Sequence, residues 1–227
     1  MKSVAIEGAT AIAADSLRAT YADYLTRTVG AQELAHIVEQ ITAAYRARGY
    51  FLSRAMIPAQ DVADGHLRIE IIEGYVSNIV IEGDAPELAA YANALINERP
   101  AQITTLERAL YLMGDVPGVR FKASRMTPDP QDMARHTLVV AAERVPFDAN
   151  FYTDNRGKPD AGELQGYVRG GAAHLLSFGD KLSGGYFFVP DQPGELAFGE
   201  LNYAASLGYD GTTISANASV SRNDQGQ

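Results

Sequence analysis

The order of apolar and polar positions in the first 145 residues predicts helices and strands in alternation. A short apolar strand over residues 4–8 ends at a glycine. A helix is predicted over residues 15–28, with Asp15 or a neighbour as its cap, and a second helix over residues 32–48. This second helix carries an apolar stripe at helical spacing, made of Leu34, Ile37, Val38, Ile41 and Tyr45. Gly49 then ends the helix in the position that favours glycine.

Two strands complete this first unit, over residues 50–58 and 67–73. In the second of them Leu67, Ile69 and Ile71 alternate with charged residues, which is the period of a half-buried strand. The predicted order of the unit is therefore β-α-α-β-β.

The next seventy residues repeat this order. A strand over residues 79–83 again ends in Ile-Glu-Gly, and residues 86–97 form a helix with Leu88, Tyr91 and Leu95 on one face. Thr104 and Glu107 have the spacing of a capping box for a further helix. Strands follow over residues 120–127 and 136–143.

Short sequence matches support a duplication. SRAMIPAQD at residues 53–61 resembles SRMTPDPQD at residues 124–132, and the two Ile-Glu-Gly strands open units of similar length. Two short matches can arise by coincidence, but the shared order, length and landmarks favour two copies of one unit.

From Phe147 onward only strand patterns remain. Apolar and polar residues alternate in five segments of about 9–12 residues, which suits tilted strands that cross a hydrocarbon core. Turns rich in glycine and aspartate separate them, at residues 177–180, 191–194 and 209–212. A soluble sandwich alternates in the same way, but the alanines and glycines between aromatic residues on the apolar face favour a membrane sheet.

The predicted fold class is α+β, in three domains. Residues 1–75 and 76–145 are two tandem β-α-α-β-β domains, and residues 146–227 are the first antiparallel strands of a truncated transmembrane β-barrel. Five such strands cannot close, and a sheet in lipid must close because lipid offers no hydrogen bonds to its edges. We therefore expect further strands after this segment.

Composition narrows the function. The net charge of −9 disfavours nucleic-acid binding, and the lack of cysteine excludes disulfides and thiolate metal sites. The four histidines lack metal-ligand spacing, and the chain has neither a strong phosphate-binding loop nor a nucleophile elbow. We expect no enzyme, no metal and no cofactor. Residues 1–7 are not a secretory signal and no run of 18 apolar residues occurs, so we expect a fragment at both ends.

Two segments carry a family resemblance. They are ARGYFLSRAMIPAQDVADGHLRIEIIEGYVSNIVIEGD at residues 47–84 and YTDNRGKPDAGELQGYVRGGAAHLLSFGDKLS at residues 152–183, the latter with a Leu-x-x-Gly-Asp-x-Leu turn. With the tandem units, which resemble polypeptide-transport-associated (POTRA) domains, they are similar to the two-partner secretion transporters, the hemolysin-activator and filamentous-hemagglutinin-transporter family.

This resemblance implies a sixteen-stranded, monomeric pore in the lipid of the outer membrane, with residues 1–145 in the periplasm. The partner would be an unfolded secreted protein, and the family uses no nucleotide or cofactor. Its gating loop would lie beyond Gln227. Two other functions stay open: an outer-membrane protein assembly or insertion factor, and a soluble client-binding POTRA module.

POTRA domains are expected to bind an unfolded client by β-augmentation at an open sheet edge. The candidate residues lie on the predicted edge strand and on the preceding helix: Leu106, Leu110, Met113, Phe121, Ala123 and Arg125. For each of them, a place in the core is the competing interpretation.

Polar residues within the membrane strands are expected to line the pore. The candidates are Asn150, Tyr152, Arg169, Glu200 and Asn202. The competing interpretation is the wet surface of a soluble sheet.

Overall fold

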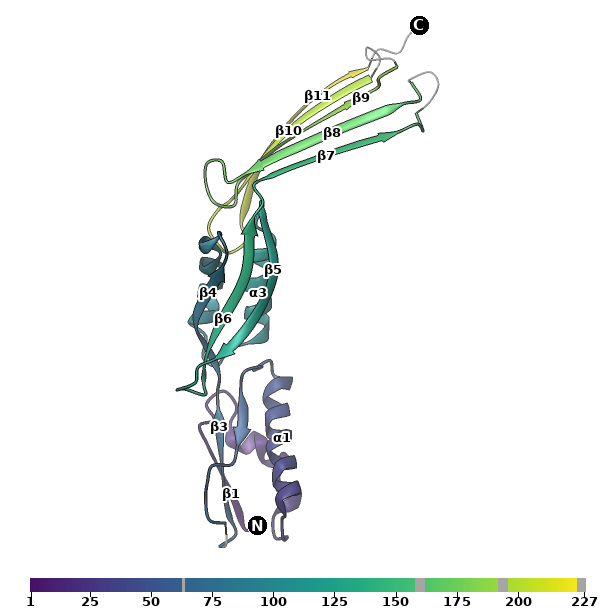
Figure 1. Cartoon of the computed structure of the whole chain (residues 1–227). Coiled ribbons are helices and arrows are strands. Elements are labelled where there is room, and N and C mark those ends of the chain that lie inside the picture. Colours follow the sequence, from purple (N-terminus) through teal and green to yellow (C-terminus); the bar gives the residue numbers. More distant parts are fainter. Residues whose placement is uncertain (63, 158–161, 192–195, 224–227) are drawn as a thin grey trace. The chain divides into compact units, whose positions relative to one another are not determined.

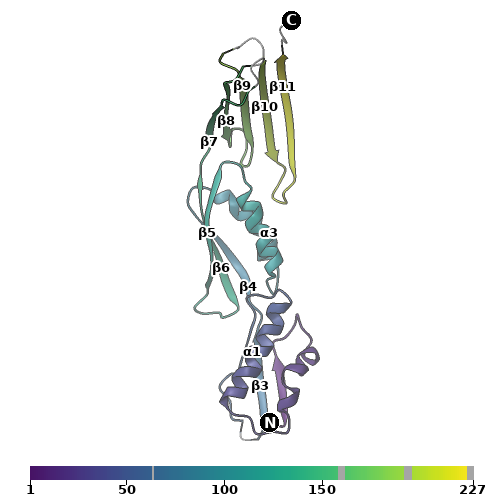
Figure 2. The ribbon, with the colours of Figure 1, turned by 90° about the vertical axis from the view of Figure 1, so that its right-hand side faces the viewer.

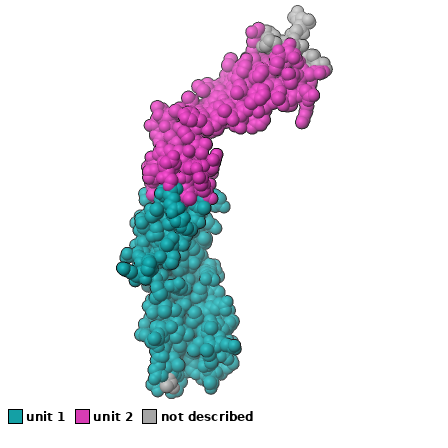
Figure 3. All heavy atoms as spheres, in the orientation of Figure 1, with its two compact units in different colours: residues 1–82, 91–111, 123–140 teal, residues 83–90, 112–122, 141–227 magenta. Residues whose placement is uncertain are grey.

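The computed structural model describes residues 1–62, 64–157, 162–191 and 196–223. The chain divides into two compact units, one made of residues 1–82, 91–111 and 123–140 and the other of residues 83–90, 112–122 and 141–227 (Figure 3). The division passes through the second predicted domain, so the domain bounds 1–75, 76–145 and 146–227 remain a prediction. The predicted turn at residues 191–194 falls mostly outside the described residues.

The first sheet contains three strands in the order β1-β3-β2: β1 (Ser3–Glu7), β2 (Arg54–Met56) and β3 (His66–Ile72). Figure 1 labels β1 and β3. β1 runs parallel to β3, and β2 runs antiparallel to it. The helix α1 (Ala31–Ala47) packs on this sheet through the predicted stripe, of which Ile37, Ile41 and Tyr45 are fully buried. Burial of each such side chain contributes about 1.5–3 kcal/mol. The predicted helix 32–48 is confirmed.

The second sheet has the order β4-β6-β5 (Figure 2), with β4 (Tyr75–Glu82), β5 (Val119–Pro128) and β6 (Arg135–Arg144). Its helical segments are η3 (Pro86–Ala92), α2 (Asn93–Ile96) and α3 (Ile103–Gly114). In both sheets the first strand lies at one edge, the last strand in the middle and the second strand at the other edge. The two predicted β-α-α-β-β segments therefore have sheets with the same strand order, as their sequence landmarks predict.

The glycines of the two Ile-Glu-Gly strands occupy equivalent places. Gly8 and Gly83 both have positive φ, of 76° and 131°. An added Cβ would lie 2.4 Å from the carbonyl oxygen of Ile71 at the first and 1.8 Å from that of Ala142 at the second. Each glycine thus lets the chain pass close to the central strand of its own sheet.

The third sheet is an antiparallel meander in the order β11-β10-β9-β8-β7 (Figure 1). Its strands are β7 (Phe147–Asp154), β8 (Gln165–Ala173), β9 (Lys181–Phe188), β10 (Leu196–Ser206) and β11 (Thr213–Asn223). The five predicted strands are all present.

Four local predictions need correction. The helix predicted over residues 15–28 is two short 3₁₀ segments, η1 (Ala14–Thr20) and η2 (Ala22–Tyr24), and the chain then turns at Thr26 with φ of 66°. The helix predicted over 86–97 is likewise divided into η3 and α2. The strand predicted over 50–58 is reduced to β2, because residues 50–53 form a turn with Ser53 N–H bonded to Tyr50 O.

The fourth correction concerns the start of α3. Thr104 lies inside the helix, so it does not cap it. Glu98 stabilises the start of α3 instead. Its carboxylate accepts a hydrogen bond from the N–H of Gln102 at 2.8 Å and another from the hydroxyl of Thr105 at 2.9 Å. Among the described residues, no helix is both long enough and apolar enough to cross a membrane.

Candidate functional site

β5 forms one edge of the second sheet, with β6 as its neighbour on the other side. Lys122, Ala123, Ser124 and Arg125 are exposed, and Phe121 is half-buried. A strand at a sheet edge presents backbone N–H and C=O groups on its outer side, which an extended chain can pair with. The predicted edge strand over 120–127 therefore lies at an edge, with Ala123 and Arg125 accessible.

Arg125 is already engaged by a carboxylate on the other edge strand. Its guanidinium donates to Glu82 through two hydrogen bonds, of 3.0 and 2.5 Å. These bonds hold the pKa of Glu82 below its ordinary value. Arg125 can therefore offer its backbone and its aliphatic stem to a ligand without leaving Glu82.

Two further cations on β5 share one carboxylate of β6. Lys122 forms an ion pair with Glu143, and Arg120 donates to Glu143 at 2.9 Å. The hydrogen bond from Lys122 is the largest cause of the lowered pKa of Glu143; burial opposes it, and Arg120 adds to the lowering. Charged side chains along an edge disfavour unspecific pairing with the edge of another sheet. Among the described residues, no further strand pairs with this edge.

The helix candidates are placed differently. Leu106 is 9% exposed and Met113 is fully buried, so both belong to the core side of α3. Leu110 is half-buried. Leu106 and Met113 are therefore core residues, as the competing interpretation expects. Of the remaining candidates, Ala123 and Arg125 are exposed, and Phe121 and Leu110 are partly accessible.

The candidate pore-lining residues share one face of the meander. Cross-strand register aligns Asn150 with Arg169, Arg169 with Gly185, and Gly185 with Glu200. Because side chains alternate along a strand, Tyr152 and Asn202, two residues away from this row, point to the same side. All five candidates thus lie together on one polar face.

Glycines on this face make room for long polar side chains. The hydroxyl of Tyr167 donates to Glu200 at 2.6 Å and lies over Gly185, where a Cβ would be 2.3 Å from it. Lys181 reaches Asp148 across Gly171 in the same way. Sequence reasoning missed Tyr167 as a partner of Glu200, because the two residues lie two strands apart and only the register brings them together.

The opposite face of the meander is apolar and open. Large hydrophobic side chains on it are well exposed: Phe151 62%, Val168 44%, Tyr186 48%, Leu201 52% and Val220 73%. An apolar band on one face and a polar face opposite are typical of outer-membrane barrel strands.

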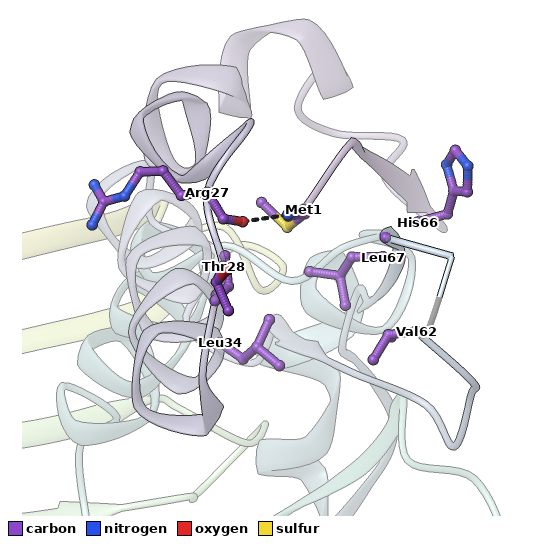
Figure 4. Close-up of a pocket in the computed structure, with 9 residues that line it drawn as sticks. Met1, Arg27, Thr28, Leu34, Val62, His66 and Leu67 are labelled. Atoms are coloured by element: carbon purple, nitrogen blue, oxygen red, sulfur yellow. Dashed lines mark hydrogen bonds between the residues drawn. The ribbon is translucent and has the colours of Figure 1, made fainter.

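A shallow pocket of about 260 Å³ opens beside the start of α1 (Figure 4). Leu34, Val62 and Leu67 point toward it, and the amino group of Met1 donates to Arg27 O at its rim. Among the described residues no three His, Asp or Glu side chains gather as a metal site would require.

Comparison with known proteins gives a consistent result. Residues 1–74 match the model of the POTRA domain, ShlB-type. The outer membrane transporter CdiB-2 of Burkholderia pseudomallei is 28% identical over 94% of the chain and 38% of its own length. The heme/hemopexin transporter protein HuxB of Haemophilus influenzae is 20% identical over 75% of the chain and 31% of its own length.

Among solved structures, CdiB from Escherichia coli matches with a TM-score of 0.75 and 20% identity, over 97% of the chain and 41% of its own length. This match shows the fold and confirms the predicted class of POTRA-like sheets followed by the first strands of a barrel. The chain spans about a quarter to two fifths of the length of the first relatives. The predicted resemblance is thus confirmed at this level: residues 1–74 are similar to POTRA domains of the ShlB type, and the chain as a whole is similar to outer membrane transporters.

Proposed function

We propose that the chain is the POTRA region and first barrel segment of an outer-membrane transporter that secretes a partner protein by two-partner secretion. Residues 1–145 then lie in the periplasm and the meander lies in the outer membrane. The matched relatives are outer membrane transporters by name, which supports this assignment. The relatives extend beyond the chain, so secretion belongs to the whole transporter.

The periplasmic part binds the client while it is unfolded. The observation that carries this step is the open edge of β5 with Ala123 exposed on it. An extended client adds a strand there, and its backbone hydrogen bonds make binding tolerant of sequence. Such tolerance suits a protein that must accept a whole polypeptide segment by segment.

The two faces of the meander support the membrane assignment. The apolar face meets outer-membrane lipid. In water, the large apolar side chains of all five strands would stay exposed to solvent, which is unfavourable. The polar face, with Asn150, Arg169 and Glu200 in one row, lines an aqueous path through a single-chain pore.

The two other functions have less support. A soluble client-binding module would bury the apolar face against a second layer, and the described residues provide none. An assembly factor would share the POTRA fold, but the named relatives with matched sequence are transporters. We assign the chain no catalytic role and no cofactor.

The test uses affinity capture by the full chain in detergent micelles. The probe is a reduced and alkylated polypeptide that stays unfolded after dilution from urea. Ala123→Pro removes one backbone donor from the edge strand, which an edge tolerates, and capture should fall by at least about tenfold. Ala123→Ser keeps the donor and is the matched control. If Ala123→Pro, with amides of β6 still protected from hydrogen exchange, captures as much probe as the unchanged chain, the client-binding step is wrong.

A further inference from the structure

The turn between β8 and β9, residues 174–180, has a shape fixed by one buried carboxylate. Asp180 is fully buried. It accepts the N–H of Leu175 at 2.7 Å, of Leu176 at 2.8 Å and of Ser177 at 3.0 Å, and the hydroxyl of Tyr203 at 3.1 Å. Burial raises the pKa of Asp180, but these hydrogen bonds outweigh it and the net pKa is lowered. The aspartate of the Gly-Asp pair in the sequence motif thus holds the backbone of this turn by accepting its amide hydrogens.

His174 opens the turn in a backbone conformation that is uncommon for residues other than glycine. Its φ is 59°, in the left-handed region where glycine or asparagine would cost less. A non-glycine residue held there indicates that the side chain has a use of its own. The contacts of the imidazole show what that use is.

The imidazole of His174 connects the turn to the loop before β5. Gly179 N–H donates to Nδ1 at 3.2 Å, which leaves Nε2 to carry the hydrogen and donate to Gly118 O at 3.2 Å. The neutral ring with its hydrogen on Nε2 satisfies both bonds. Gly118 permits the approach, since a Cβ there would lie 2.4 Å from the Cβ of Ala173.

A second contact holds the same turn from the end of β6. Phe178 stacks on the His174 ring, with centroids 4.9 Å apart and an interplanar angle of 6°. The guanidinium of Arg144 lies 5.4 Å from the Phe178 ring centroid and donates to Asp84 O and to Glu87. All these residues belong to one compact unit.

We propose that the 174–180 turn is a fixed dock between the second β-α-α-β-β segment and the membrane sheet, with His174 as the positioning residue. Asp180 fixes the shape of the turn. The His174 ring donates a hydrogen bond to Gly118 O, and the Phe178 ring contacts the guanidinium of Arg144. A displacement of β5 or β6 is then passed to β8 and β9 instead of being absorbed by a loose loop. This inference does not depend on client binding and would stand if the proposed β5 site failed.

The test measures the spread of one distance in the full chain in detergent micelles. The chain has no cysteine, so Asp115→Cys and Asn217→Cys place two spin labels on exposed residues of this unit. Pulsed electron spin resonance should give one narrow distance distribution. His174→Gly keeps the backbone conformation at lower cost but removes the ring, and the distribution should become at least about twofold broader. Leu176→Ala, in the same turn but 83% exposed, is the matched control and should leave it unchanged.

Hydrogen exchange of the turn amides separates docking from folding. In His174→Gly the amides of Leu175, Leu176 and Ser177 should stay protected, because Asp180 still accepts them. A broadened distribution with protected amides supports the dock. An unchanged distribution, or a broadened one with unprotected amides, would overturn the role assigned to the His174 ring.

Discussion

The hydroxyl of Tyr45, in the last turn of α1, donates a hydrogen bond of 2.9 Å to Glu73 Oε1, directly after β3. The same carboxylate accepts the N–H groups of Thr10 and Ala11, each at 2.8 Å, and the hydroxyl of Thr10. One side chain therefore joins three segments of the first domain: the loop after β1, the helix and the end of the central strand.

Loss of the Glu73 charge should destabilise the first domain. Glu73→Gln removes the negative charge that strengthens the hydrogen bonds from Thr10, Ala11 and Tyr45, at a cost of about 1–3 kcal/mol. Urea denaturation of the full chain, followed by the helical signal in far-ultraviolet circular dichroism, measures this change in the free energy of unfolding. Glu70→Gln, on an exposed position of β3, is the control and should stay within about 0.5 kcal/mol of the unchanged chain. Equal effects of the two substitutions would contradict the assignment.

The Glu73 cluster also predicts a pH dependence. Burial raises the pKa of Glu73, but the hydrogen bonds from Thr10, Ala11 and Tyr45 outweigh it and the net pKa lies below the ordinary 4.5. A carboxyl group whose pKa is lowered by folding stabilises the fold above its unfolded pKa, and this stabilisation is lost as the pH falls through the folded value. The stability of the first domain should thus fall below about pH 4.5. Glu73→Gln should make that fall less steep, and an unchanged slope would count against the cluster.

Arg144 takes the place of Glu73 beside the second sheet. Gly8 approaches Ile71 two residues before Glu73, and Gly83 approaches Ala142 two residues before Arg144. Arg144 holds its own post-glycine loop through Asp84 and Glu87, with donor and acceptor roles reversed. The duplicated fold thus keeps a clamp at this position although the charge has changed sign.

The two equivalent glycines should tolerate no side chain. Gly8→Ala and Gly83→Ala each place a Cβ at positive φ and against a backbone oxygen, so each should cost more than about 1–2 kcal/mol. Gly114→Ala is the control: it lies at the end of α3 with nothing within 4 Å of the added Cβ, and it should be neutral or stabilising by up to about 1 kcal/mol. Thermal unfolding of the three variants gives the comparison, and a neutral result at Gly8 and Gly83 would disprove the need for glycine.

Sequence periodicity located most elements because their cause is local. The stripe of α1 and the alternation of β3 follow from which face is buried, and the five strands after Phe147 follow from the separation of apolar and polar side chains onto opposite faces of the sheet. The helices at 15–28 and 86–97 were predicted wrongly in type, since short apolar segments satisfy 3₁₀ and α spacing alike. The cap of α3 was missed because Glu98 reaches it from outside the motif that the sequence displays.

The side chains that join segments distant in the sequence were harder to find. Glu73 bonds to residues more than 60 positions earlier, and His174 bonds to Gly118, 56 positions away. No spacing rule predicts such partners, because they meet only after the sheets form. The polar row of the meander was predictable as a set, since alternation alone assigns Asn150, Arg169 and Glu200 to polar faces.

The two faces of the meander should respond differently to charge. Leu201→Arg puts a cation on the apolar face, which costs about 2–4 kcal/mol at the middle of a bilayer. Asn202→Arg, one residue along on the polar face, is the matched control and should cost little. Flotation of the full chain with phosphatidylcholine vesicles measures the retained fraction. Equal retention of the two variants would show that the apolar face does not meet lipid.

Site-specific photo-crosslinking shows whether an unfolded client pairs with the open edge of β5. A benzoyl-phenylalanine probe replaces Ala123 on β5 or, as a control, Glu39 on the exposed side of α1. The full chain in detergent micelles is mixed with a reduced and alkylated, unfolded polypeptide and irradiated. The account predicts a strong cross-linked product from position 123 and little from position 39. Equal products from both positions, or a product from position 39 alone, would contradict it.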